Sequence, residues 1–176
     1  PQHKELLARM RNYELAFRMQ TQVPQIIDIN NETAATRELY GIGTKPTDNL
    51  GRRCLLARKL VEKGVRFVQL YASTWDSHDY IARAHGSLIR SVDRPIAGLL
   101  KDLKERGMME DTLVVFATEF GRGPFQPAPG VNGRGHHSRV YSSWLAGAGV
   151  KGGMVHGASD ELGDNVAKDV VTVHDF

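Results

Sequence analysis

Hydrophobic positions along the chain follow two patterns, a helical spacing and short unbroken runs. Apolar residues recur at three- and four-residue steps over residues 6–17, 48–63 and 82–106, which predicts helices there, with a shorter helix over residues 33–39. We expect the first helix to end before Pro24, because the residue ahead of a proline avoids helical backbone angles. We also expect its apolar face to lie in the core. Pro95 predicts either a kink in the long helix or the first turn of a new one.

Unbroken apolar runs predict strands over residues 65–71, 113–117 and 140–146. Helices and strands alternate along the chain, which is typical of a parallel sheet with crossover helices. We therefore expect an α/β fold. Residues 121–135 contain five Gly and three Pro. A loop of that length in a compact domain is usually functional or disordered.

The composition is that of a globular protein of one domain. The 176 residues are 41% hydrophobic and 24% charged, with a net charge of +3. Basic residues lie beside acidic ones, as over residues 101–106, which indicates solvated helix faces and argues against nucleic-acid binding. No stretch approaches the roughly 20 apolar residues of a membrane span. The one cysteine, Cys54, excludes an internal disulfide framework. Its position on a helical apolar stripe indicates a core residue.

Polar residues that bind metals follow the predicted strands. Asp76 and His78 come after the strand over 65–71, and Glu119 comes after the strand over 113–117. The carboxyl ends of parallel strands share one edge, where ligands bind in open α/β sheets. The adjacent pair His136 and His137 lies after the glycine-rich loop. Imidazole and carboxylate donors suit zinc or manganese. The alternatives are a turn cap with a histidine partner and two ordinary surface histidines.

Arg122 follows Glu119 by three residues and has two interpretations of equal weight. Its guanidinium offers a fixed fork of donors to phosphate, sulfate or carboxylate oxygens, or to a carboxylate that ligates the metal. It could instead form a salt bridge with Glu119. Three further histidines, His85, His156 and His174, are interpreted as packed or surface residues.

The combined motifs resemble an uncharacterised bacterial sulfatase-like family of unknown function in the alkaline-phosphatase-like superfamily. The stretches that carry the resemblance most clearly are Trp75–His78, Val92–Leu100, Thr112–Phe116 with Glu119–Arg122, and Gly133–His137. The similarity covers the whole chain. It implies a three-layer α/β/α sandwich with a mostly parallel sheet and a two-metal ester-hydrolase ancestry. It also implies an export signal, and hence a periplasmic or extracellular full-length protein.

The chain begins within a predicted helix and stops without a closing turn, so we expect a fragment that is incomplete at both ends. Residues 1–176 would then form a single domain, the C-terminal portion of an alkaline-phosphatase- or sulfatase-like domain. The nucleophile would lie outside these residues, because Cys54 lacks the Cys-x-Pro-x-Arg signature of sulfatases. We expect the isolated piece to bind metal weakly and to turn over little substrate.

By resemblance, the metal ligands are Asp76, His78, Glu119 and His136 or His137, and Arg122 steadies the anion. Two positions depart from the family pattern. Phe120 stands where the superfamily usually has a histidine, and Gly135 stands where the family loop has an aspartate. Each change removes either a ligand or a residue that orients one.

The function expected from the sequence is metal-dependent hydrolysis of a phosphate or sulfate ester, with two divalent ions clamping the reacting oxygens. Zinc is the first choice of metal, with manganese and calcium as alternatives. The substrate would be a small-molecule or polysaccharide ester, and neither nucleic acid nor a membrane span is expected. The alternative function is a non-catalytic scaffold or binding domain that retains part of the metal site, which the two departures at Phe120 and Gly135 favour.

Overall fold

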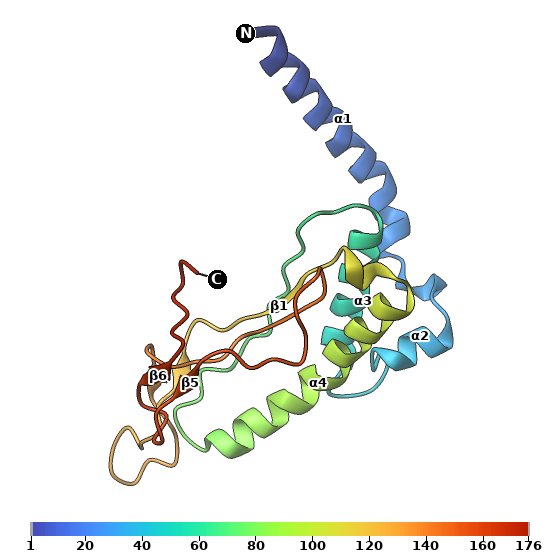
Figure 1. Cartoon of the computed structure of the whole chain (residues 1–176). Coiled ribbons are helices and arrows are strands. Elements are labelled where there is room, and N and C mark those ends of the chain that lie inside the picture. The colour runs from blue at the N-terminus through green and yellow to red at the C-terminus, as the bar shows by residue number, and fades with distance from the viewer. Residues whose placement is uncertain (1, 176) are drawn as a thin grey trace.

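The structure is a computed structural model that describes residues 2–175, and it is mainly helical (Figure 1). Four α-helices come first and short strands follow. The helical elements are α1 (Gln2–Ile27), η1 (Ile29–Asn31), α2 (Ala34–Leu39), α3 (Asp48–Glu62), α4 (Ile81–Glu105) and η2 (Met108–Glu110). The strands are β1 (Val114–Phe116), β2 (Gly121–Arg122), β3 (His136–His137), β4 (Trp144–Ala146), β5 (Ala158–Ser159) and β6 (Val166–Lys168).

The strands form three two-stranded antiparallel sheets, β1–β4, β2–β3 and β5–β6. No strand pair within residues 2–175 is parallel, so the expected three-layer α/β/α sandwich with a mostly parallel sheet is wrong. The apolar runs correctly indicate extended chain at β1 and β4, but they carry no information about the direction in which strands pair. The strand expected over residues 65–71 is wrong, since the third run forms no strand, and its Phe67 and Tyr71 side chains are exposed.

Three of the predicted helices are confirmed, as α2, α3 and α4. Pro95 lies inside the continuous helix α4, so no new helix begins there. The expected end of the first helix before Pro24 is wrong, since α1 continues to Ile27. A proline removes one backbone donor, and a helix of this length keeps its other hydrogen bonds on both sides. Within residues 2–175, no helix is both long and apolar enough to cross a membrane.

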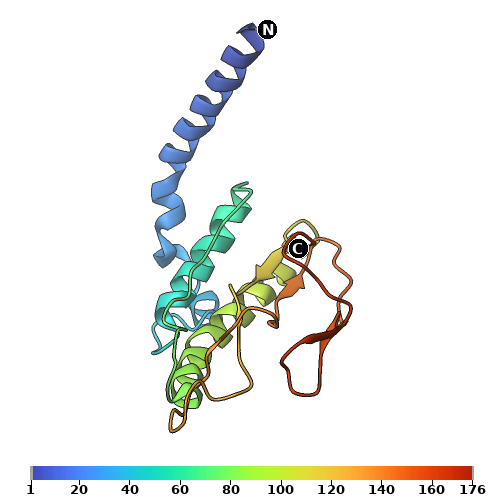
Figure 2. The same cartoon turned by 90° about the vertical axis from the view of Figure 1, so that its left-hand side faces the viewer.

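The hydrophobic core lies between α3 and α4, which pack side by side (Figure 2). Tyr40 is fully buried between them, together with Cys54 and Leu55. Gly98 makes room for this arrangement, because a Cβ atom there would lie 2.8 Å from the carbonyl oxygen of Leu39. The interpretation of Cys54 as a core residue is confirmed. Burial raises the pKa of its thiol to about 12, so the sulfur stays protonated and unreactive at neutral pH.

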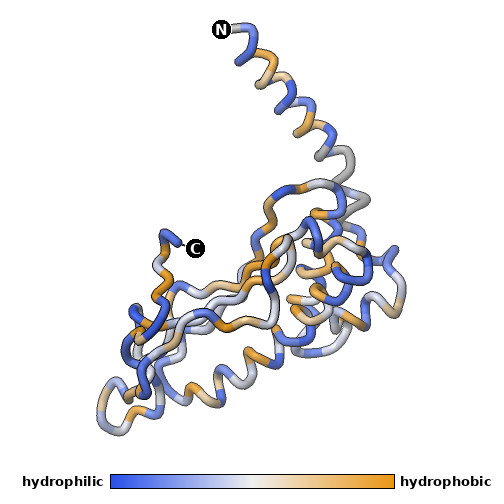
Figure 3. Tube along the Cα trace, in the orientation of Figure 1, coloured by the Kyte–Doolittle hydropathy of each residue, from blue (hydrophilic) through white to orange (hydrophobic). Residues whose placement is uncertain are grey.

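The apolar face of α1 does not belong to this core. Figures 1 and 3 show the helix projecting from the rest of the chain, with hydrophobic positions along it. Leu6, Met10, Tyr13 and Phe17 are all exposed, Tyr13 to 78%. The expectation that this face lies in the core is therefore wrong. Helical spacing identifies which side of a helix is apolar, but it does not identify what covers that side.

Truncating the core residue Leu55 to Ala should therefore cost far more stability than truncating Tyr13 to Ala. Leu55 is fully buried, so its truncation leaves a cavity and is expected to lower the free energy of unfolding by about 2–5 kcal/mol. The exposed Tyr13 should change it by no more than about 0.5 kcal/mol. Chemical denaturation of the two variants measures both values. Equal losses would show that α1 is part of the cooperative core.

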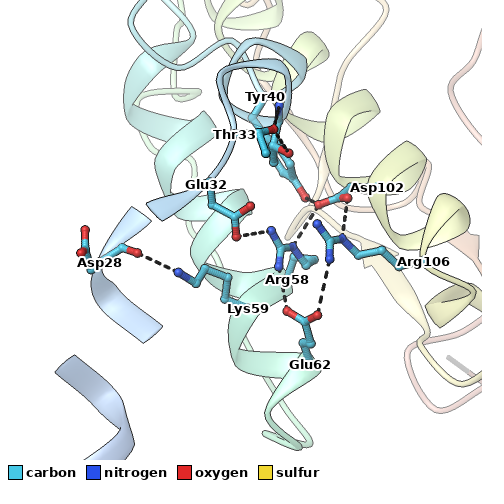
Figure 4. A network of polar contacts seen from close by, with 10 residues as sticks. Asp28, Glu32, Thr33, Tyr40, Arg58, Lys59, Glu62, Asp102 and Arg106 are labelled. Carbon is cyan, nitrogen blue, oxygen red and sulfur yellow. Dashed lines mark hydrogen bonds and ion pairs between the residues drawn. The ribbon is translucent and has the colours of Figure 1, made fainter. Parts of the chain in front are cut away.

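A buried ion network joins α3, α4 and the segment just before α2 (Figure 4). Nothing in the sequence pattern indicated it. Arg58 on α3 is its centre, with a side chain only 2% exposed. It donates to Asp102 at 3.0 Å, to Glu32 at 2.6 Å and to Glu62 at 2.7 Å. Asp102, within the stretch 101–106 interpreted as a solvated face, is instead buried.

Asp102 also accepts hydrogen bonds from the Tyr40 hydroxyl at 2.8 Å and from Arg106 at 2.7 Å. Burial acts to raise the pKa of this carboxyl, but the hydrogen bonds from Arg106 and Tyr40 and the charge of Arg58 hold it below its ordinary value. Asp102 is therefore ionised at neutral pH. It ties α4 to α3 and to Tyr40, which precedes the turn into α3.

Candidate metal centre

The candidate site is built on the turn that leads from the extended segment into α4. Ser77 donates its backbone N–H to the carbonyl oxygen of Trp75 at 2.9 Å, which turns the chain at Asp76. Left-handed backbone angles flank this turn, with φ of 74° at Thr74 and 47° at Tyr80. Such angles cost about 1–3 kcal/mol in residues other than glycine and cluster at functional sites. The turn presents the side chains of Asp76 and His78 to solvent.

The second part of the site is the β2–β3 pair, in which Arg122 lies opposite His136. Both side chains reach across to Asp76. The His136 Nε2 atom lies 2.6 Å from Asp76 Oδ1, and an Arg122 nitrogen donates to the same oxygen at 3.2 Å. Arg122 also donates to the carbonyl oxygen of Trp75 at 2.6 Å. Residues about 60 positions apart in the chain are thus joined at one carboxylate.

Asp76, His78 and His136 form the one group of potential metal ligands found among the described residues, with one ligand atom from each within 4.8 Å of the others. The two histidine rings lie close, with centroids 4.7 Å apart. Zn–N bonds of about 2.0–2.1 Å place two ligands of a tetrahedral ion about 3.3 Å apart. The distance from Asp76 Oδ1 to His78, 3.5 Å, is close to that separation. The 2.6 Å to His136 is that of a direct hydrogen bond, which would lengthen by about 0.7 Å to admit an ion. The three residues therefore supply the donor set for a zinc-sized ion, and the ion would replace this hydrogen bond.

The electrostatics of the site favour the ligating form of the carboxylate. The hydrogen bond with His136 is the largest cause that lowers the pKa of Asp76, and the hydrogen bond from Arg122 and the nearby histidine charges lower it further. A metal needs the deprotonated carboxylate. The site is open to solvent, with the Asp76 side chain 70% exposed. Two imidazoles and one carboxylate leave a fourth position for water or substrate, as in catalytic zinc sites.

Gly133 docks the glycine-rich loop against the turn of the site. A Cβ atom at Gly133 would lie 1.5 Å from the carbonyl oxygen of His78, so any other residue would push the loop away. Next to it, the backbone N–H of Asn132 donates to Asp79 at 3.1 Å. This contact sets the position of β3, and with it His136, relative to His78. The loop over residues 121–135 was expected to be functional or disordered, and its position against the candidate site is consistent with the first alternative but does not test it.

Replacing Gly133 with Ala is therefore expected to weaken metal binding although no ligand is removed. Loss of support for a ligand typically costs about 10–100-fold in metal affinity. Gly123→Ala in the same loop is the matched control, because its Cβ would find only an ordinary contact, Gly135 O at 3.8 Å. Zinc titration of both variants measures the difference. Unchanged affinity in Gly133→Ala would contradict the positioning role.

The other predicted ligands lie outside this group of three. Glu119 is exposed. His137 is buried and its Nε2 atom lies 3.2 Å from the carbonyl oxygen of Gly163, with Asp164 3.9 Å away. Consecutive side chains of a strand point to opposite sides, so His136 and His137 do not face the same ion. The ligand assignments from the sequence remain predictions, with three of the five residues brought together by the fold.

The contacts of Arg122 agree with one part of its first interpretation, donation to a candidate ligand carboxylate. Its carboxylate partner is Asp76 rather than Glu119, and its second acceptor is the Trp75 carbonyl. It therefore orients the ligand carboxylate. Three supporting residues were also missed: Gly133, Asp79 and Phe120, whose ring stacks obliquely on His136 with centroids 4.2 Å apart. Gly133 alone carried a signal, as a glycine close before the two histidines.

Comparison with known families adds one finding. Residues 1–176 match the model of a family described as protein of unknown function (DUF1501). No curated protein and no solved structure matches the chain. The match spans every stretch in which the sequence resembled a family of unknown function, and it confirms that resemblance at the level of the family.

Proposed function

The chain belongs to the DUF1501 family, and we propose that it contributes the metal centre of a hydrolase acting on phosphate or sulfate esters. The observation that carries the proposal is the convergence of Asp76, His78 and His136 within 4.8 Å at an open surface. Its motifs also resemble the alkaline-phosphatase-like superfamily, which supports the same reaction class. The substrate would be a small-molecule or polysaccharide ester, and the natural protein would work outside the cytoplasm.

Zinc is the metal that we propose, with manganese as the alternative. Two imidazole nitrogens and one carboxylate oxygen are suited to these ions, whereas calcium takes oxygen ligands throughout. When bound, the ion would polarise the ester oxygen and lower the pKa of a bound water. Three donors suffice for one ion. A second ion, as the sequence predicts, would need further ligands.

The protein's own contribution is to hold these three donors in place. Arg122 fixes the carboxylate of Asp76 and braces it on the Trp75 carbonyl. The ring of Phe120 packs against His136 and limits its rotation. His78 lies on the exposed turn, with its Nδ1 atom 3.5 Å from Asp76 Oδ1. A preorganised set of donors reduces the cost of binding the ion and the reacting ester.

A non-catalytic scaffold or binding domain that retains part of a metal site is the second candidate. The observation in its favour is that the fold gathers only three donors in the described residues, with Phe120 and Gly135 at positions where the family resemblance expects donors. In that case the ion would hold the turn at Asp76 against β3 and would catalyse no reaction. The two candidates differ in turnover, and both require the metal.

The test measures release of 4-nitrophenol from its phosphate and sulfate esters by the complete natural protein. Turnover should disappear with chelator and return with added zinc or manganese. Asp76→Asn should lower it by about 100-fold or more, in the range of losses for removed transition-state contacts. Metal binding without any turnover would favour the scaffold, and turnover that survives chelation would contradict both candidates.

A further inference from the structure

A second candidate binding site lies in a surface cleft on the helical region. The cleft has a volume of about 450 Å³ and lies among α2, the turn after it, α3 and α4. That volume is within the range of small-molecule sites, roughly 300–1,000 Å³. The cleft shares no residue with the metal centre. The two sites are also apart in space. His85 of α4 contacts Trp75 beside the candidate metal centre, and Arg94, which lines the cleft, lies nine residues further along the same helix, or about 14 Å away.

Three arginines from three helices line the cleft: Arg37 of α2, Arg52 of α3 and Arg94 of α4. Glu38 is the one acidic residue among the lining residues. Arg52 is neutralised by Asp48, to which its Nε atom donates at 3.0 Å. Arg94 donates to the backbone carbonyl of Glu38, and the Glu38 carboxylate lies 4.0 Å away. The cleft therefore has an excess of positive charge.

Arg37 is the unusual member of the three. It is half-buried, yet no hydrogen bond or ion pair joins its side chain to any residue within the described part of the chain. Partly burying a charge without a partner is costly. Its position in the last turn of α2 offsets part of that cost, because a cation there interacts favourably with the helix end. The interaction with the end of α2 concerns Arg37 alone, and it does not explain why the guanidinium groups of Arg52 and Arg94 lie on the same cleft.

Three apolar residues, Ile29, Ala34 and Ile42, also line the cleft. A guanidinium binds phosphate and sulfate oxygens through two parallel hydrogen bonds, which makes Arg37 and Arg94 suited to an oxyanion. The three apolar lining residues suit a hydrophobic group attached to that anion. The lining therefore complements a molecule with one charged end and one apolar end.

We infer that this cleft binds a small molecule in which a phosphate or sulfate group is attached to an apolar group. The oxyanion lies between Arg37 and Arg94, and the apolar group lies against Ile29 and Ile42. Arg52 adds positive charge while it remains paired with Asp48. The site is independent of the metal centre and needs no metal ion.

Calorimetric titration of the chain with phenyl phosphate tests the inference, after chelation so that the metal centre does not take up the ligand. Arg37→Gln and Arg94→Gln should each raise the dissociation constant about tenfold, the effect of one charge-assisted hydrogen bond. Inorganic phosphate should bind several-fold more weakly than phenyl phosphate, because it has no apolar group to contact Ile29 and Ile42. Arg37→Gln should change the melting temperature little, because the Arg37 side chain has no hydrogen-bond or ion-pair partner to lose in the described part of the chain and its interaction with the end of α2 is weak.

Two controls separate the cleft from other sources of anion binding. Arg90→Gln removes the same charge from α4, one turn before Arg94, at an exposed position that does not line the cleft. His136→Ala disables the metal centre. Neither should change the dissociation constant. The inference fails if phenyl phosphate shows no saturable binding in the millimolar range, if Arg90→Gln weakens binding as much as Arg94→Gln, or if His136→Ala abolishes it.

Discussion

Replacing Asp102 with Ala is expected to lower the free energy of unfolding by about 3–5 kcal/mol, the usual cost of removing one member of a buried ion pair. The Asp102 side chain is 7% exposed and accepts hydrogen bonds from Arg58, Arg106 and Tyr40 (Figure 4). Its removal leaves the buried guanidinium of Arg58 short of an acceptor and the Tyr40 hydroxyl without its partner. Chemical denaturation of the variant measures the loss.

Glu105→Ala is the matched control for Asp102→Ala, because both residues lie in the last turns of α4. Glu105 forms an exposed ion pair with Lys101, and such pairs contribute little. The control should lose no more than about 0.5 kcal/mol. If Asp102→Ala lost as little as the control, Asp102 would not be holding α3 and α4 together, and the network would be a surface feature.

Replacing Asp76 with Ala is expected to lower the affinity for zinc by at least about 100-fold. This is more than the cost of losing a residue that only supports a ligand. The change removes a charged ligand atom. It also removes the acceptor that holds His136 at 2.6 Å and Arg122 at 3.2 Å, so the remaining donors lose their alignment. Competition with a coloured chelator measures the affinity at fixed pH.

Glu119→Ala is the control for that experiment, and it separates the ligands expected from the sequence from those that the fold brings together. Glu119 is exposed and lies outside the group of three donors. Its truncation should change the zinc affinity by less than about threefold, well below the cost of a lost supporting contact. A loss as large as that of Asp76→Ala would place Glu119 on the ion and would require β1 and the turn at Asp76 to approach each other.

The helices were predictable because each carries its own signal. Residues such as Leu50, Cys54 and Leu55 on α3 recur at helical spacing, and this local pattern identifies both the element and its buried face. The sheet was not predictable in the same way. The apolar runs of β1 and β4 specify extended chain, but whether two strands run parallel or antiparallel depends on the path between them. That path is a long irregular loop with no periodic signal.

The difference between local patterns and long-range contacts also explains which residues of the candidate metal centre could be predicted. Asp76, His78 and His136 were identified by chemistry and by position at segment ends, and the fold brings them together. His136 and His137 were both predicted as ligands from a loop, whereas they lie on the strand β3, where neighbouring side chains face opposite sides. The ion network was missed because Arg58 and Asp102 lie 44 residues apart. Sequence spacing reveals ion pairs one helical turn apart, but not those between helices.

The measurement that tests the central claim most directly is the metal content of the protein purified without chelator, determined by elemental analysis. The proposal predicts about one equivalent of zinc or manganese per chain, the capacity of the three donors Asp76, His78 and His136. His136→Ala should lose the ion and His137→Ala should keep it, because only His136 faces Asp76. Protein without bound metal, or an ion lost with His137 and retained without His136, would contradict the proposed centre.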